Sequence, residues 1–196
     1  MASLVLSGDT SGSITVSAPA VAGSNTQTLV ATTGTLAPIV SGTAVASTSG
    51  TSIDFTSIPS WVKRITVMFQ GVSTNGTSLM QVQIGSGSVT TSGYSSTASY
   101  SGASSTQYAY VTTGFVINTT GTSVAAYLQT GVLQIVLIGS NTYVASGTMS
   151  TGSTAQQTNA LGGSSPALSG ALDRVRITTV NGTDTFDAGS INILYE

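Results

Sequence analysis

The sequence contains no histidine and no cysteine, and it has only four basic and six acidic side chains among its 196 residues. Histidine supplies most general-base and metal-ligand chemistry near neutral pH, and cysteine supplies thiolate nucleophiles and soft metal ligands. Their absence removes most of the side chains that build active sites, and it excludes a disulfide framework. We therefore expect a building or binding protein that is not an enzyme and holds no metal and no cofactor.

Charge of either sign is scarce, because charged residues make up 5% of the chain and the formal net charge is −2. No basic patch is available for the phosphates of nucleic acid, and no polybasic segment for anionic lipid. The amino-terminal sequence lacks the features of a secretory signal, and the most apolar run, 132–138, is too short to span a bilayer. We expect neither nucleic acid nor a membrane as a partner, whereas a weakly charged surface favours association with other protein surfaces.

The first 50 residues differ from the rest of the chain. They contain no aromatic side chain, since every Tyr, Phe and Trp lies after Gly50, and Pro19 and Pro38 interrupt any long strand. Short apolar stretches without aromatic residues cannot close a core of their own. We predict an extended arm over residues 1–50, ordered by contact with the body or with neighbouring subunits, and a packed body over residues 51–196.

Apolar side chains recur at every second position in several segments of the body, which is the period of a strand with one buried face. The clearest of these segments are 65–69, 80–84, 175–177 and 191–195. Segment 132–138 is apolar at nearly every position, which predicts a central strand covered on both faces. Helical periodicity is nearly absent, and Asn-Gly and other turn signals separate the strands. We predict an all-β fold, an antiparallel β-sandwich of jelly-roll type.

Two long segments, 86–107 and 148–169, are rich in Ser, Thr and Gly and are predicted to be surface loops, where a rigid sandwich commonly carries binding sites. Four tyrosines lie in or beside the first of them and are the candidate contacts with a ligand: Tyr94, Tyr100, Tyr108 and Tyr110. A tyrosine ring offers apolar area and its phenol offers a hydrogen bond, which suits contact with carbohydrate or protein. The alternative is that these rings seal a sandwich edge or a subunit interface.

The few ionisable side chains leave three kinds of chemical site open. Lys63 is the one candidate base for a serine nucleophile, and the alternative is that it marks a strand entry with its ammonium group in solvent. Carboxylate-based glycoside hydrolysis needs a pair of acids, for which the body offers Asp54, Asp173, Asp184 and Asp187. Calcium binding by Asp184 with Asp187 is also open. The alternative for the aspartates is turn capping, or pairing of Asp173, Asp184 or Asp187 with Arg174 or Arg176 on adjacent strands.

Residues 12–36 resemble a pattern of the tail-fibre and other virion proteins of tailed bacteriophages, T-L-x-A-P-A-V-A-G-x-N-T-x-T-L-P-A-x-T-G-T, with Val30 where the pattern usually carries proline. The body resembles a β-rich domain of the same phage proteins through segments 51–59, 63–69 and 176–196. The resemblance covers about half of the chain. It implies a homotrimeric fibre or decoration element that anchors to other virion proteins by its arm and turns its β body outward.

The leading hypothesis is a structural protein on the outer surface of a phage particle, a short fibre or fibre-tip adhesin. It would dock through residues 1–50 and bind a host surface glycan or protein through the body, with multivalency adding up weak contacts. One alternative is a capsid decoration or cement protein that stabilises the head shell. A remote alternative is a glycan-degrading enzyme that works with carboxylates.

Overall fold

The computed structural model describes residues 3–7, 10–17, 20, 24, 38–101, 106–125, 127–152 and 157–196. The chain divides into two compact units, Met1–Leu36 and Ala37–Glu196. The secondary structure within these described ranges is entirely β, and every strand pair is antiparallel. No helix that could cross a membrane occurs in them.

The amino-terminal unit contains one hairpin, in which β1 (Ser3–Ser7) pairs with β2 (Ser13–Ser17). Leu4 lies opposite Val16 and Leu6 opposite Ile14, so these four side chains share one face of the ribbon. Each of them is more than half exposed. A two-stranded hairpin is marginally stable in water by itself. Most of the predicted arm between residues 18 and 37 lies outside the described residues.

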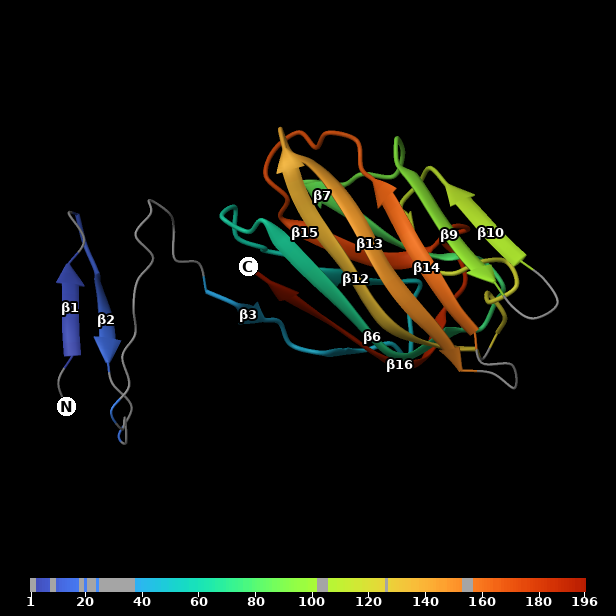
Figure 1. Cartoon of the computed structure of the whole chain (residues 1–196), viewed down its shortest axis with the longest axis horizontal. Coiled ribbons are helices and arrows are strands. Elements are labelled where there is room, and N and C mark those ends of the chain that lie inside the picture. The colour runs from blue at the N-terminus through green and yellow to red at the C-terminus, as the bar shows by residue number, and fades with distance from the viewer. Residues whose placement is uncertain are drawn as a thin grey trace. The chain divides into compact units, whose positions relative to one another are not determined.

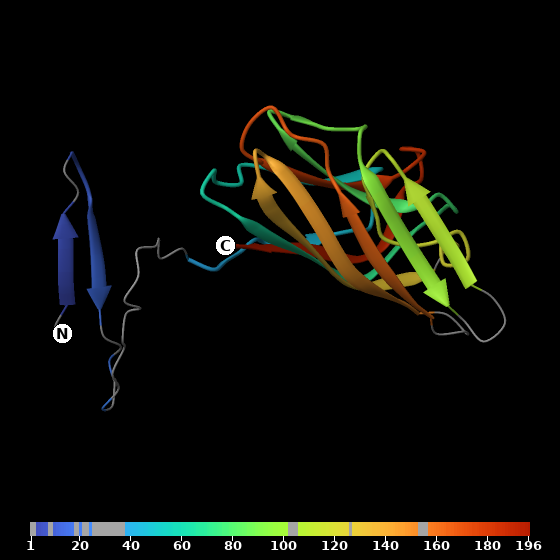
Figure 2. The ribbon, with the colours of Figure 1, turned by 45° about the horizontal axis from the view of Figure 1, so that its top comes forward.

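The body contains two antiparallel sheets, which form separate layers in Figures 1 and 2. The larger, nine-stranded sheet has the order β10-β9-β14-β13-β12-β6-β16-β3, with β4 also paired to β16. Its strands are β3 (Val40–Ser41), β4 (Val45–Ala46), β6 (Arg64–Thr74), β9 (Ser95–Ser101), β10 (Thr106–Val111), β12 (Leu128–Gly139), β13 (Thr142–Gly152), β14 (Gln157–Ser164) and β16 (Phe186–Tyr195).

The smaller, five-stranded sheet has the order β11-β7-β15-β5, with β8 also paired to β7. Its strands are β5 (Ser52–Phe55), β7 (Met80–Ser86), β8 (Ser88–Val89), β11 (Phe115–Val116) and β15 (Arg174–Thr179). The predicted all-β, antiparallel sandwich is confirmed, while the jelly-roll connectivity stays a prediction.

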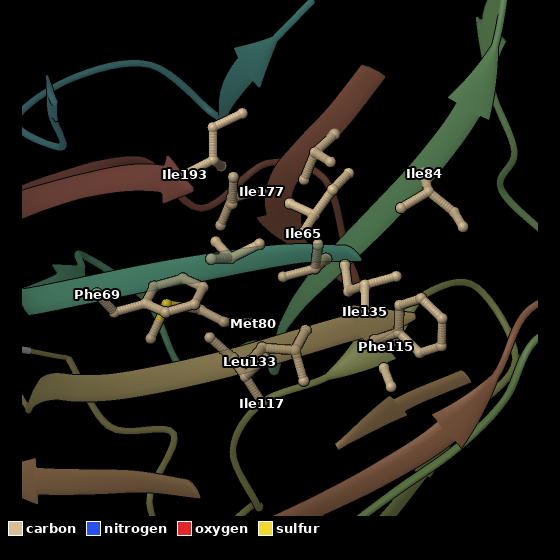
Figure 3. Close-up of a cluster of buried hydrophobic side chains, with 14 of the residues drawn as sticks. Ile65, Phe69, Met80, Ile84, Phe115, Ile117, Leu133, Ile135, Ile177 and Ile193 are labelled. Atoms are coloured by element: carbon tan, nitrogen blue, oxygen red, sulfur yellow. The ribbon is translucent and has the colours of Figure 1, made fainter. Parts of the chain in front are cut away.

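The core lies between the two sheets and uses the alternating positions that the sequence predicted. Figure 3 shows Ile65 and Leu133 of the larger sheet together with Ile84 and Ile177 of the smaller one. All four side chains are at most 2% exposed. The period of two therefore did identify the side of β6, β7, β15 and β16 that faces the core.

Strand β12 has one buried face and one exposed face, so the prediction that segment 132–138 is covered on both sides is wrong. Leu133 and Ile135 are buried, whereas Val132 is 40% exposed and Val136 is 37% exposed. The strand is central within its sheet, between β13 and β6, but the outer face of that sheet is open. Valine favours the extended backbone of a strand in either situation, so its presence does not report burial.

The prediction of long loops over 86–107 and 148–169 is also wrong, because strands β9, β13 and β14 and the start of β10 occupy most of the described part of these segments. They keep the period of two with small side chains. Ala98 and Leu161 are buried, while the residues directly before them, Thr97 and Ala160, are exposed. Small alternating residues give a weak apolar signal, which composition alone assigns to loops.

The segment before Gly50 contributes to the body. Ser41 pairs with Leu194, and Val45 pairs with Ile191, so β3 and β4 extend the larger sheet beside β16. The sequence placed the boundary near Gly50, whereas the structure divides between Leu36 and Ala37. A segment that adds to the edge of an existing sheet needs no aromatic core of its own.

Candidate binding surface

The outer face of the larger sheet is neutral across five neighbouring strands. The described residues of β10, β9, β14, β13 and β12 include no charged side chain. Outward positions carry hydroxyls, an amide and β-branched side chains, such as Thr148, Gln134 and Val132. Such a face can form hydrogen bonds and apolar contacts, but it cannot select a ligand by charge.

Two tyrosines project from this face at its free edge. Tyr108 pairs with Ser99 and Tyr110 pairs with Thr97 in the β9–β10 ladder, and their side chains are 78% and 61% exposed. Because both rings lie on the same face of β10, two residues apart, they are spaced about 7 Å along the strand. The rings and the neighbouring hydroxyls together form a platform suited to a sugar ring or a protein side chain.

Tyr94 is buried, and its prediction as a surface contact is wrong. Its hydroxyl accepts a hydrogen bond from the Ile84 backbone N–H at 2.9 Å and has the carbonyl oxygens of Ile84 and Thr90 within reach at 3.2 and 3.1 Å. The ring packs edge-on against Phe115, with 5.1 Å between ring centroids. Burial raises the pKa of the Tyr94 phenol to about 12, despite an opposing hydrogen bond to Ile84. Tyr94 thus locks a turn onto the core.

Tyr100 lies on the inward-facing side of β9, with its side chain half-buried. Its hydroxyl accepts a hydrogen bond from Nε2 of Gln157 at 3.0 Å. The structure therefore separates the four predicted tyrosines into two outward residues, Tyr108 and Tyr110, and two that serve the packing of the sandwich. The signal for this separation is the alternation of inward and outward positions along β9 and β10, which the sequence interpretation missed because it assigned the segment to a loop.

A shallow hollow of about 360 Å³ lies over the centre of the same outer face, and it was not predicted. Val132, Gln134, Ser146 and Thr148 contribute to its lining, together with Gly147. A side chain at Gly147 has no room, because a Cβ there would stand 2.2 Å from the carbonyl oxygen of Val132. The glycine thus permits close approach of β12 and β13 beneath the hollow.

Three ion pairs involve most of the charged side chains of the body. Arg176 holds Asp54 across β15 and β5 with two hydrogen bonds, Nε to Oδ1 at 2.7 Å and Nη2 to Oδ2 at 3.0 Å. Arg174 bonds its sequence neighbour Asp173, which holds the pKa of that carboxyl below its usual range. The third pair joins Arg64 to Glu196. A cross-strand pair was predicted for Arg176, but its partner is Asp54.

The remaining candidates for catalysis or metal binding have structural roles. Asp184 accepts a hydrogen bond from the Ser78 backbone N–H at 2.9 Å and one from Nδ2 of Asn181 at 2.6 Å, whereas the backbone N–H groups of the turn itself bond to Oδ1 of Asn181. Asp187 bonds the Ser73 hydroxyl. Lys63 is exposed directly before β6, as the strand-entry interpretation predicted. Within the described ranges, no group of three or more acidic side chains converges on a metal site.

Comparisons with protein-family models, with curated proteins and with solved structures gave no match. The chemistry that the outer face of these five strands offers is hydrogen bonding by hydroxyls and amides, and contact with the exposed rings of Tyr108 and Tyr110.

Proposed function

We propose that this chain is a structural protein of a tailed-phage particle, a short fibre or fibre-tip adhesin that binds the host surface through the outer face of its larger sheet. The observation that carries the proposal is the pair of exposed rings, Tyr108 and Tyr110, at the edge of a charge-free face of five strands. The resemblance of residues 12–36 and of the body to virion proteins supports the same assignment.

The binding chemistry follows from the platform around Tyr108 and Tyr110. A sugar ring can lay its C–H face on a tyrosine ring while its hydroxyls exchange hydrogen bonds with Thr97 and Ser99. A neutral, exposed platform of this kind binds a single ligand weakly. A homotrimer would present three platforms, and a repeated surface polymer would then be held by multivalency when the geometry lets several engage together.

The β1–β2 hairpin supplies the anchor in this proposal. Leu4, Leu6, Ile14 and Val16 form an apolar face that is between 54% and 69% exposed at each residue. Burying a Val, Leu or Ile side chain fully contributes about 1.5–3 kcal/mol. Contact of this face with another virion protein would therefore stabilise both the hairpin and the attachment.

The test replaces both outward tyrosines in assembled particles. Truncation of two tyrosines at the centre of a contact costs about 2 kcal/mol or more, so Tyr108→Ala with Tyr110→Ala should lower host adsorption at least about tenfold. The double Tyr→Phe variant is the matched control, since it keeps the rings and removes only the phenols. Unchanged adsorption of particles that contain the Ala variant would remove the adhesin proposal.

Two further measurements separate the alternatives. Labelling of the protein in purified particles shows whether it occupies the tail or the head, and a head-shell location would replace the adhesin by a decoration protein. Incubation with host envelope glycan should release no new reducing ends, because the acids are committed to ion pairs and turns. Release of reducing ends would establish an enzyme instead.

A further inference from the structure

A second hollow lies on the smaller sheet, and its chemistry differs from that of the tyrosine platform. It measures about 320 Å³, at the lower end of the range of about 300–1,000 Å³ that small-molecule sites occupy. Gln81, Gln83, Thr178 and Arg176 line it, and Val180 is the one apolar side chain among its lining residues. We call it the glutamine groove. Its size fits a small polar ligand rather than a folded partner.

Two carboxamides that are almost fully buried form the base of the glutamine groove. Gln81 is 2% exposed and Gln83 is 5% exposed, although both alternate with the core residues of β7 and point away from the core. Thr113 holds them in place. Its hydroxyl donates to Oε1 of Gln81 at 2.7 Å, and its carbonyl oxygen accepts from Nε2 of Gln83 at 2.8 Å. The amides are thereby fixed before any ligand arrives.

These bonds leave a donor group and an acceptor available in the groove. The Nε2 group of Gln81 has only a long contact of 3.5 Å with the Thr179 carbonyl oxygen. Among the described residues, no group donates to Oε1 of Gln83. This oxygen is not fully shielded from solvent, so a ligand in the groove can reach it. The donor and the acceptor lie two residues apart on the same face of β7 and suit a ligand with several hydroxyl groups, since each hydroxyl both donates and accepts.

The charge of the glutamine groove is balanced. Arg176 enters the lining already bound to Asp54 through Nε and Nη2. An anionic ligand would have to compete with that carboxylate, whereas a neutral ligand can use the remaining guanidinium N–H groups and the Thr178 side chain. The lining is also too polar for the apolar side chains of a peptide.

We propose that the glutamine groove binds one neutral sugar unit through its hydroxyl groups. This site goes beyond the attachment proposed for the tyrosine platform, because it lies on the other sheet and uses no aromatic ring. The two proposals therefore fail separately. A chain with Tyr108→Ala and Tyr110→Ala should bind sugar in the groove as the unmodified chain does.

The test is a titration of the full chain followed by NMR of the glutamine side-chain amides. The probes are D-glucose, D-galactose and N-acetyl-D-glucosamine at millimolar concentrations, with N-acetylneuraminic acid and triglycine as charged and peptide comparisons. At least one neutral sugar should shift the amide signals of Gln81 and Gln83 and leave that of Gln70 on β6 of the larger sheet unchanged. This readout needs no variant, so a folding defect cannot obscure it.

Substitution then assigns the effect. Gln83→Leu should weaken binding of that sugar at least about tenfold, because it removes the acceptor and leaves ligand hydroxyls unpaired. The matched control, Gln70→Leu, changes an exposed glutamine on the larger sheet and should change the affinity by less than about twofold. The proposal is overturned if no neutral sugar shifts the groove signals, if only the acid or the peptide does, or if the signal of Gln70 shifts equally.

Discussion

The hydroxyl of Tyr94 gives the sharpest prediction about stability. In Tyr94→Phe the ring keeps its contact with Phe115, and only the oxygen is lost. The carbonyl oxygen of Ile84 keeps a hydrogen bond from the Thr90 N–H at 3.0 Å, but the Ile84 N–H loses its partner. Leaving one buried N–H unsatisfied costs about 1–3 kcal/mol. We expect Tyr94→Phe to lower the free energy of unfolding by about 2 kcal/mol.

Urea and thermal unfolding of the full chain measure this loss. For a domain of this size, 2 kcal/mol corresponds to a decrease in Tm of about 4–8 °C. Tyr108→Phe is the control, because its side chain is 78% exposed, and its effect should stay within about 0.5 kcal/mol. If both variants unfolded at the same denaturant concentration, the assignment of the Tyr94 hydroxyl as a structural bond would be refuted.

The same residue predicts how stability changes at high pH. Burial raises the pKa of Tyr94 from 10.0 to about 12, so the unfolded chain loses this proton first as the pH rises. The stabilisation is complete below pH 10 and is lost as the pH approaches 12. A difference of two pKa units corresponds to about 2.7 kcal/mol. Tyr94→Phe should therefore show a shallower loss of stability than the unmodified chain across this interval, and parallel profiles would contradict the prediction.

Three further predictions test the fold. Gly189 has a φ of +91°, and a Cβ there would lie 2.3 Å from the Gly71 carbonyl oxygen. Gly189→Ala should therefore destabilise the protein more than Gly182→Ala, where φ is +70° and the space is open. Equal losses of Tm in the two variants would contradict this. Asn159 is completely buried and bonds the hydroxyls of Thr122 and Thr151, so Asn159→Ala should cost about 2–4 kcal/mol in urea unfolding, and a loss below about 0.5 kcal/mol would be evidence against that role. The Asp54–Arg176 pair is about one-third exposed on each side, so a double-mutant cycle should give a coupling of only about 0.2–1 kcal/mol that decreases with salt.

The alternation of apolar residues was sufficient to predict the core of the body. Positions such as Val67, Val82 and Ile177 are fully buried because each lies in a strand whose other face points outward. The same rule failed for Val132 and Val136, because the sequence does not show whether a second layer covers the outer face of a sheet.

The tyrosines show why the candidate site was only partly predictable. Tyr94 and Tyr108 occur in similar Ser/Thr/Gly-rich surroundings, yet one is buried and the other is 78% exposed. Tyr108 is exposed because the register of β9 with β10 turns it outward, and Tyr94 is buried because its hydroxyl bonds the backbone of Ile84. Neither cause can be recognised from the residues next to each tyrosine. The glutamine groove was missed for a related reason. In the sequence Gln81 and Gln83 are ordinary outward positions of a strand, and their hydrogen bonds to Thr113 come from a distant part of the chain.

The attachment of β3 and β4 to the edge of the larger sheet has a mechanical consequence. Val40 pairs with Tyr195, so the chain enters the body beside β16, the last strand. Two short ladders and a few further hydrogen bonds hold β3 and β4 there, whereas β16 is bound along its length to β6. A pull on Pro38 would peel these two strands away first and release roughly 30 Å of chain before force reached the packed layers. The entry segment would thus lengthen under force before the strands of the sandwich are pulled.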